Sequence, residues 1–168
     1  EPEHDQGARD AEGQGQEEPI STLPGVAGSQ FERPTVGADI DIAPDIEGTE
    51  LRVYVAHFKS GSASRDRTLR LNQATDDANH FASYIATRAD ARIYYAGDLN
   101  AEPGDEAIEK LLEPQTTLTR QIVVDLNNAS PVTRPISGRI LDHLLYSSTL
   151  SGAMLSPFIF NTATFTAN

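Results

Sequence analysis

The sequence predicts a layered α/β domain. Short β-prone segments alternate with segments whose apolar residues recur at helical spacing, in the order strand, helix, strand, helix and then several strands. The chain of 168 residues is long enough to bury one hydrophobic core. No run of apolar residues approaches the length of a membrane-spanning helix, so no membrane span is expected.

Ordered structure is expected to begin with a strand at residues 51–58, because this segment is β-prone and is followed by Gly61 and several serines. Between residues 68 and 87 the apolar positions recur at helical spacing, which predicts an amphipathic helix with one buried stripe. The stripe consists of Leu71, Ala74, Ala78, Phe81, Ala82 and Ile85.

A second strand is expected at residues 93–96, where Gly97 ends it. Pro103 stands where a helix could start, and a short helix is expected at residues 106–112. Further strands are predicted at residues 122–124, 140–146 and 157–160.

The chain divides into an acidic segment, residues 1–27, and a partial domain, residues 28–168. The first segment has few apolar residues, so we expect it to be disordered or a long loop. Residues 38–42 alternate in polarity. The acids at 39, 41 and 45 lack the glycine turn and closing glutamate of a calcium loop, which favours a solvated edge or loop.

Charge is distributed unevenly. Residues 1–50 hold 13 acidic and two basic residues, whereas residues 51–168 hold 12 acidic and 11 basic residues. Residues 52–70 contain five basic residues and a single acid. This positive charge suits an anionic ligand such as a phosphate, but it also fits a solvated loop followed by the first turn of a helix. The chain has no cysteine, so disulfides and thiolate metal sites are excluded.

Polar residues follow two of the predicted strands. Asp98 and Asn100 are two residues apart at the end of a strand, so their side chains point the same way and could hold a metal and a phosphate. A strand that simply ends in a polar turn would show the same residues. His57 closes the first strand and Lys59 follows it. This pair could contact a phosphate, or His57 could be a structural residue.

Asp142 lies inside the apolar segment at residues 140–146. A carboxylate between Ile140 and Leu144 is costly to bury unless it is paired, so a histidine or a cation is expected beside it. The adjacent His143 faces the other way and is interpreted as structural.

Four blocks in this order resemble the endonuclease/exonuclease/phosphatase superfamily, and within it the bacterial extracellular nucleases. The four blocks are His57-Phe58-Lys59-Ser60, Arg70-x-x-Gln73-Ala74, Gly97-Asp98-Leu99-Asn100 and Ile140-Leu141-Asp142-His143-Leu144-Leu145. The resemblance implies the DNase I-like fold, a four-layer α/β/β/α sandwich, of which this sequence carries an incomplete part.

The resemblance also implies an activity, divalent-metal-dependent phosphodiester hydrolysis, and roles for the matching residues. His57 corresponds to the histidine that contacts the scissile phosphate, and Asp98 to the residue that orients or deprotonates the attacking water. Asn100 corresponds to the asparagine that binds a phosphate oxygen, and Asp142 to the carboxylate that orients a second histidine. Asp98 and Asn100 are the expected metal ligands, and Lys59 and Arg70 the expected substrate-binding residues.

The implied cofactor is Mg²⁺, with Mn²⁺ or Ca²⁺ as alternatives, and the implied partner is a nucleic acid or another phosphodiester. An extracellular or cell-surface location follows from the same resemblance. Alternatives on the same fold are a phosphatase or sphingomyelinase-like hydrolase, and an alternative of another class is a non-catalytic binding module. The sequence leaves the oligomeric state open.

Parts of the superfamily pattern are not found in this sequence. These parts are the strand with an asparagine, the strand with a metal-binding glutamate and the final Ser-Asp-His. Because Mg²⁺ would lack its main anionic ligand, we expect the chain alone to have little or no activity.

Overall fold

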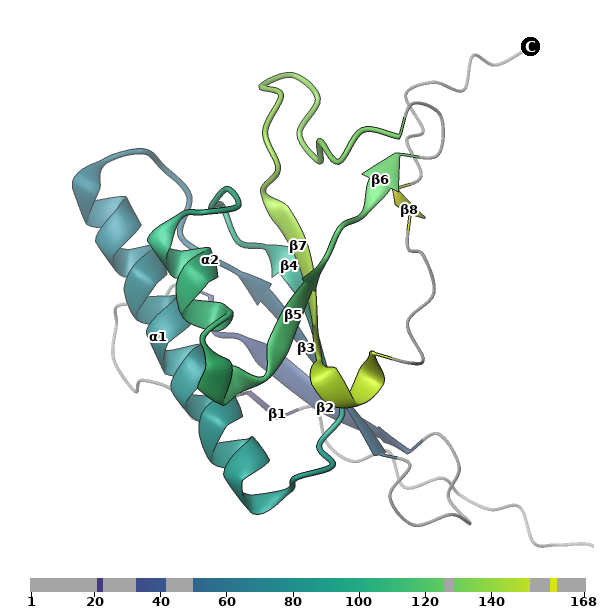
Figure 1. The fold of residues 1–168 in the computed structure, drawn as a ribbon. Coiled ribbons are helices and arrows are strands. Elements are labelled where there is room, and N and C mark those ends of the chain that lie inside the picture. Colours follow the sequence, from purple (N-terminus) through teal and green to yellow (C-terminus); the bar gives the residue numbers. More distant parts are fainter. Residues whose placement is uncertain (1–20, 23–32, 42–49, 126–128, 152–157, 160–168) are drawn as a thin grey trace, which may run out of the picture.

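The computed structural model describes residues 21–22, 33–41, 50–125, 129–151 and 158–159. These residues form a mixed six-stranded sheet in the order β1-β2-β3-β4-β7-β5, with helices packed on one face (Figure 1). The strands of this sheet are β1 (Ser21–Thr22), β2 (Val36–Asp41), β3 (Glu50–His57), β4 (Ile93–Asp98), β7 (Asp142–Ser147) and β5 (Leu118–Gln121). The predicted α/β class is confirmed.

The centre of the sheet is the parallel pair β3–β4, and the other neighbouring strands pair antiparallel. Helix α1 (Ser64–Thr87) connects β3 to β4, as a parallel pair requires a crossover connection. The strands β6 (Val124–Asp125) and β8 (Phe158–Ile159) pair separately in parallel.

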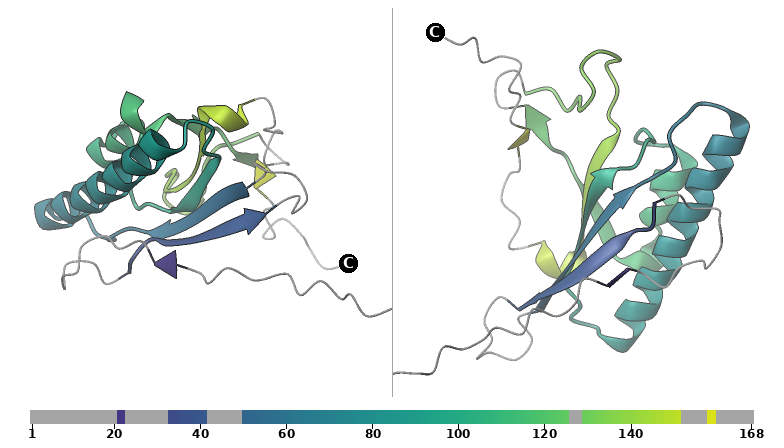
Figure 2. Two further views of the ribbon diagram at one scale, coloured as in Figure 1. Left: turned by 90° about the horizontal axis from the view of Figure 1, so that it is seen from below. Right: turned by 180° about the vertical axis from the view of Figure 1, so that it is seen from behind.

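The helices α1 and α2 (Glu106–Leu111) cover the same face of the sheet, which two further views confirm (Figure 2). Phe81 of α1 is fully buried and packs against Tyr54 of β3 and Tyr95 of β4, with ring centroids 5.0 and 5.3 Å apart. Such aromatic pairs bury large apolar areas, so the core lies between α1, α2 and this face.

Side chains on the opposite face of the sheet remain partly or fully accessible. Strand residues alternate between faces, and Val55 of β3 is 57% exposed while its neighbours Tyr54 and Ala56 are buried. Ile40 of β2 is 47% exposed. Among the residues that the structure describes, no helix covers this face, which we call the open sheet face.

Three strand predictions need correction. The segment 122–124 is a strand only at Val124, which begins β6 outside the main sheet, because β5 ends at Gln121 and Ile122 is 62% exposed. The strand expected at 140–146 begins at Asp142. Described order also begins before residue 51, since β2 pairs along its whole length with β3.

Several other predictions hold. The helix expected at residues 68–87 ends as predicted and begins one turn earlier, and the strand at 93–96 extends to Asp98. Residues 38–41, predicted to be solvated, are partly or fully exposed at the end of β2. Asp39 in this segment forms an ion pair with Arg52 of β3. None of the described helices is long and apolar enough to span a membrane. Most of residues 1–27 lie outside the described residues, so the predicted domain boundary remains a prediction.

Candidate functional site

Three candidate residues form a row across the sheet. His57 ends β3 and Asp98 ends β4, and these two residues are register partners in the parallel pair. Asp142 begins β7 and is the register partner of Asp98 in the antiparallel pair. Because register partners lie side by side on the same face, the backbone ladder brings together three residues spread over the sequence.

His57 and Asp98 are accessible as well as close. Nε2 of His57 lies 3.9 Å from Oδ2 of Asp98, and the two side chains are 46% and 39% exposed. This distance is too long for a hydrogen bond between the two groups, so one small ligand could contact both from the same side.

Asn100 joins this row through the turn that follows β4. Its φ of 48° is left-handed, a conformation that asparagine tolerates better than most residues. The backbone N–H of Asn100 donates to Oδ1 of Asp98 at 3.0 Å, and its side-chain Nδ2 donates to the carbonyl of Phe58 at 3.1 Å. Asn100 therefore connects the ends of β3 and β4.

Gly97 allows the two strands to approach closely just before the row. Its φ is 154°, and a Cβ atom built on it would overlap the carbonyl oxygen of Ala56 on β3. Any larger residue would push β4 away from β3 beside His57 and Asp98.

The loop after His57 is held by α1. Nη1 of Arg70 donates to the carbonyls of Lys59 at 2.9 Å and Gly61 at 2.8 Å, and Oε1 of Gln73 accepts from the N–H of Lys59 at 2.9 Å. Ala74 is fully buried in the core. The Arg-x-x-Gln-Ala pattern thus fixes the position of the loop that carries Lys59, and burial lowers the pKa of Arg70. Substrate contact by Arg70 and Lys59 stays a prediction.

Arg33 contacts His57, an arrangement that the sequence did not indicate. Nη1 of Arg33 lies 2.6 Å from Nε2 and 2.7 Å from Nδ1 of the imidazole. Arg33 lies just before β2, and it comes near His57 because β2 pairs with β3. A long-range pairing of this kind leaves no local signal in the sequence.

Asp142 differs from the expectation that it is buried. Its side chain is exposed, so among the described residues no buried partner is required. Its backbone N–H donates to Oγ1 of Thr133 at 3.0 Å, which positions the start of β7. His143 is structural as predicted: it is 5% exposed, its Nε2 donates to the carbonyl of Ala101 at 2.8 Å, and burial lowers its pKa.

A buried carboxylate lies beneath the sheet, away from the row. Asp77 of α1 is 6% exposed and accepts hydrogen bonds at 2.8 Å from the hydroxyls of Thr35 and Tyr95. Burial raises the pKa of Asp77 to about 7. This position follows Ala74 and precedes Phe81 at helical spacing on the buried stripe, which is a signal that could have identified it.

The row has the donor chemistry that a hard divalent cation prefers. Asp98 offers carboxylate oxygens and Asn100 offers its Oδ1, because the amide nitrogen of Asn100 is the group that bonds to Phe58. The described residues contain no cluster of three or more His, Cys, Asp or Glu side chains placed to hold a metal. Two ligands of this chemistry would leave most coordination positions of a Mg²⁺ ion to water, which is how this ion is commonly bound.

Comparison with known proteins identifies the fold. No family model and no curated protein matches the chain. Among solved structures, the human Nocturnin catalytic domain is 18% identical with a TM-score of 0.54, over 70% of this chain and 42% of that chain. A β-hairpin deletion mutant of Staphylococcus aureus beta toxin is 16% identical with a TM-score of 0.52, over 80% of this chain and 51% of that chain.

A third match bears directly on the resemblance read from the sequence. The endonuclease/exonuclease/phosphatase from Beutenbergia cavernae is 17% identical with a TM-score of 0.50, over 77% of this chain and 36% of that chain. The chain thus spans about half, or less, of the length of these structures. At these identities the likeness concerns the fold.

Proposed function

Because the chain has the DNase I-like fold of the endonuclease/exonuclease/phosphatase superfamily, we propose that it carries the phosphate-contacting part of a divalent-metal-dependent phosphodiesterase site, of the nuclease type. The observation that carries the proposal is the register of His57 with Asp98 at one sheet edge, with their side chains 3.9 Å apart. Phosphodiester hydrolysis needs groups of these two kinds facing one phosphate.

Each residue has a role that its geometry allows. His57 donates a hydrogen bond to a phosphoryl oxygen and stabilises the charge that develops there. Asp98 orients the attacking water and accepts its proton. The amide of Asn100 is fixed by Phe58 and lies next to Asp98, so it contacts a phosphate oxygen without reorganising.

The remaining site residues support these three. Asp142 extends the row on the far side of Asp98. In the superfamily pattern the carboxylate at this place orients a second histidine. Lys59 adds positive charge next to His57, on a loop that Arg70 holds in place. Asp98 and Asn100 are the residues that would hold Mg²⁺, or Mn²⁺ or Ca²⁺, which supplies charge neutralisation at the phosphoryl oxygens.

The nuclease assignment is supported by the HFKS block and by arginines near the site, rather than by the fold, which hosts several phosphoesterase specificities. The extracellular or cell-surface location implied by the resemblance belongs to the same proposal. Little or no turnover is expected from the chain alone, so binding is the more direct test.

The test is a titration of the full chain with the thymidine dinucleotide TpT, which has one phosphodiester, followed by NMR with and without Mg²⁺. We expect shifts at His57, Asp98 and Asn100, tighter binding with Mg²⁺, and at least a tenfold loss of affinity in His57→Ala, which removes a charge-assisted hydrogen bond. A matched control is His80→Ala, whose side chain bonds to Tyr54 near the core.

Two results decide the outcome. Binding that needs neither Mg²⁺ nor His57 would overturn the catalytic proposal and favour a non-catalytic binding module. Metal-dependent hydrolysis that disappears in His57→Ala would support the activity and refute the expectation that the chain alone is inactive.

A further inference from the structure

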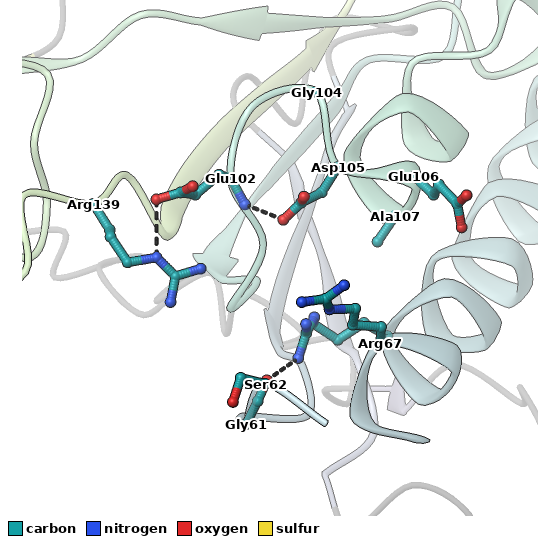
Figure 3. A pocket seen from close by; sticks show the side chains of 10 residues that line it. Gly61, Ser62, Arg67, Glu102, Gly104, Asp105, Glu106, Ala107 and Arg139 are labelled. Atoms are coloured by element: carbon teal, nitrogen blue, oxygen red, sulfur yellow. Dashed lines mark hydrogen bonds and ion pairs between the residues drawn. The ribbon is translucent and has the colours of Figure 1, made fainter. Parts of the chain in front are cut away.

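A polar cavity of about 500 Å³ lies beside the candidate site. Its walls are the loop after β3, the first turns of α1, the loop between β4 and α2, and the turn before β7 (Figure 3). Arg67, Arg70 and Arg139 line it together with Glu102, Asp105 and Glu106. The roles assigned to His57, Asp98 and Asn100 do not use this cavity.

Three guanidinium groups from two segments line the cavity: Arg67 and Arg70 belong to α1, and Arg139 lies in the turn before β7. Arg70 is 6% exposed and is fixed by the two loop carbonyls that it binds. Burial is the largest cause that lowers the pKa of Arg70; among the nearby charges, Asp105 and Asp66 raise it and, more weakly, Arg139 and Arg67 lower it. Arg67 and Arg139 therefore lie close enough to Arg70 for their charges to act on it.

Two of the acidic groups are already engaged. Glu102 accepts from Nε of Arg139 at 2.9 Å, and Oδ2 of Asp105 accepts from the backbone N–H of Glu102 at 2.7 Å. Glu106 lies on the opposite side of the view from Arg139 in Figure 3.

Arg67 is the side chain left to receive a ligand. It is exposed on the first turns of α1, and within the described part of the chain its guanidinium has no hydrogen bond or ion pair. In Figure 3 the Arg67 side chain lies between the loop of Ser62 and the loop of Asp105. A guanidinium in this position can bind a phosphate through two parallel N–H···O hydrogen bonds.

The cavity is near enough to the row for one substrate to reach both. Glu102 follows Asn100 by two residues, so their Cα atoms are at most about 7 Å apart. Gly61 follows His57 by four residues on the other wall. A phosphate held at the row would therefore have its neighbouring phosphate close to this cavity.

We propose that this cavity binds a second, uncleaved phosphate group of a nucleic-acid strand. The inference rests on the function proposed above and specifies its substrate class, because a nucleic acid carries a phosphate at every nucleotide whereas a single phosphodiester does not. Arg67 and Arg139 contact the phosphate, and Arg70 contributes a fixed positive charge behind them.

The experiment compares TpT with the same dinucleotide carrying a terminal phosphate on its 5′ or 3′ end, pTpT and TpTp, by calorimetric titration of the full chain in Mg²⁺. We expect one of the two to bind about tenfold more tightly than TpT, the gain typical of a charge-assisted hydrogen-bond pair. This gain should disappear in Arg67→Gln and in Arg139→Gln. It should persist in Arg65→Gln, which changes an exposed arginine of the same helical turn outside the cavity.

A titration with inorganic phosphate alone separates the two proposals. Shifts in the amide signals of Gly61 and Gly104 that are absent in Arg67→Gln would support the cavity even if TpT does not bind at His57, in which case the proposed function fails. Equal affinities for TpT, pTpT and TpTp, with unchanged Gly61 and Gly104 signals, overturn the second phosphate site while leaving the His57 site in place. Thermal unfolding of each variant verifies that the fold is retained.

Discussion

His57 and Asp98 are register partners at the ends of the parallel strands β3 and β4, and their side chains come within 3.9 Å of each other. The backbone ladder, rather than contacts between the two side chains, sets this separation. The pair is surrounded by an arginine that contacts His57, a close approach of the two strand backbones at Gly97 and a loop that Arg70 holds, whereas the buried carboxylate of Asp77 lies beneath the sheet.

Removing Arg33 should expose the imidazole of His57. Nη1 of Arg33 lies within 2.7 Å of both ring nitrogens, so Arg33→Gln frees the nitrogens that diethylpyrocarbonate modifies. Because an exposed hydrogen bond contributes about 0.5 to 1.5 kcal/mol, the modification rate of His57 should rise roughly two- to tenfold. Mass spectrometry of the modified protein measures this rate, with buried His143 as an internal control. An unchanged rate would show that Arg33 does not shield His57.

Gly97→Ala should destabilise the protein strongly. The added methyl group would overlap the carbonyl oxygen of Ala56, and backbone on both sides limits relaxation. We expect a loss of about 2 to 4 kcal/mol in the free energy of unfolding, measured with urea. Gly104→Ala is the matched control, because its φ is +90° but no atom lies within 4 Å of the added group. It should cost only about 1 to 2 kcal/mol of backbone strain, and equal losses in both variants would contradict the argument.

Asp77 should make stability depend on pH. Burial raises its pKa from the ordinary 3.8 to about 7, so the folded state holds a proton that the unfolded state has released between these values. Its contribution to stability is full below about pH 4 and is lost as pH rises to about 7. Asp77→Asn should therefore raise the free energy of unfolding at pH 8 by on the order of 3 kcal/mol.

The Asp77 experiment compares urea unfolding at pH 5 and pH 8 in the wild type and in Asp77→Asn. The variant should lose less stability between the two values than the wild type. Asp90→Asn, at an exposed position, is the control. If Asp77→Asn is less stable than the wild type at pH 8, the hydrogen bonds from Thr35 and Tyr95 outweigh the burial of charge.

Arg70 should matter for stability more than other arginines of α1. Arg70→Met removes the donor for the carbonyls of Lys59 and Gly61 and should cost about 2 to 4 kcal/mol. Arg67→Met changes an exposed residue and should stay within about 0.5 kcal/mol. Hydrogen exchange in residues 59–62 should increase in Arg70→Met alone. Equal stabilities would indicate that water replaces the guanidinium at the loop.

The sequence predicts those parts of the fold in which local pattern and burial agree. The stripe through Ala74, Ala78 and Phe81 identified α1 because those residues do lie in the core. Residues 122–124 are predicted as a strand because they are β-branched and apolar, yet only Val124 belongs to one, β6, and Ile122 is exposed beyond the end of β5. Composition alone does not distinguish a buried apolar run from an exposed one.

The sequence predicts which of the candidate residues lie close together but not all of their contacts, and their roles stay predictions. His57, Asp98 and Asn100 come together as expected, because strand ends in a parallel pair meet at one edge. The contact between Arg33 and His57 depends on the pairing of β2 with β3, which local pattern does not specify. Asp142 was expected to be buried because its strand is apolar, but it lies at the first position of β7, where the sheet ends in solvent.

The open sheet face has a consequence for the electrostatics of the row at its edge. The side chains of His57 and Asp98 are 46% and 39% exposed, and any two opposite unit charges 4 Å apart attract by about 1 kcal/mol in bulk water but by about 4 kcal/mol near a protein surface of lower dielectric constant. Any layer laid over Val55 and its neighbours would lower the local dielectric constant at the edge. Electrostatic interactions between charged groups at this edge would then become stronger without any movement of the side chains.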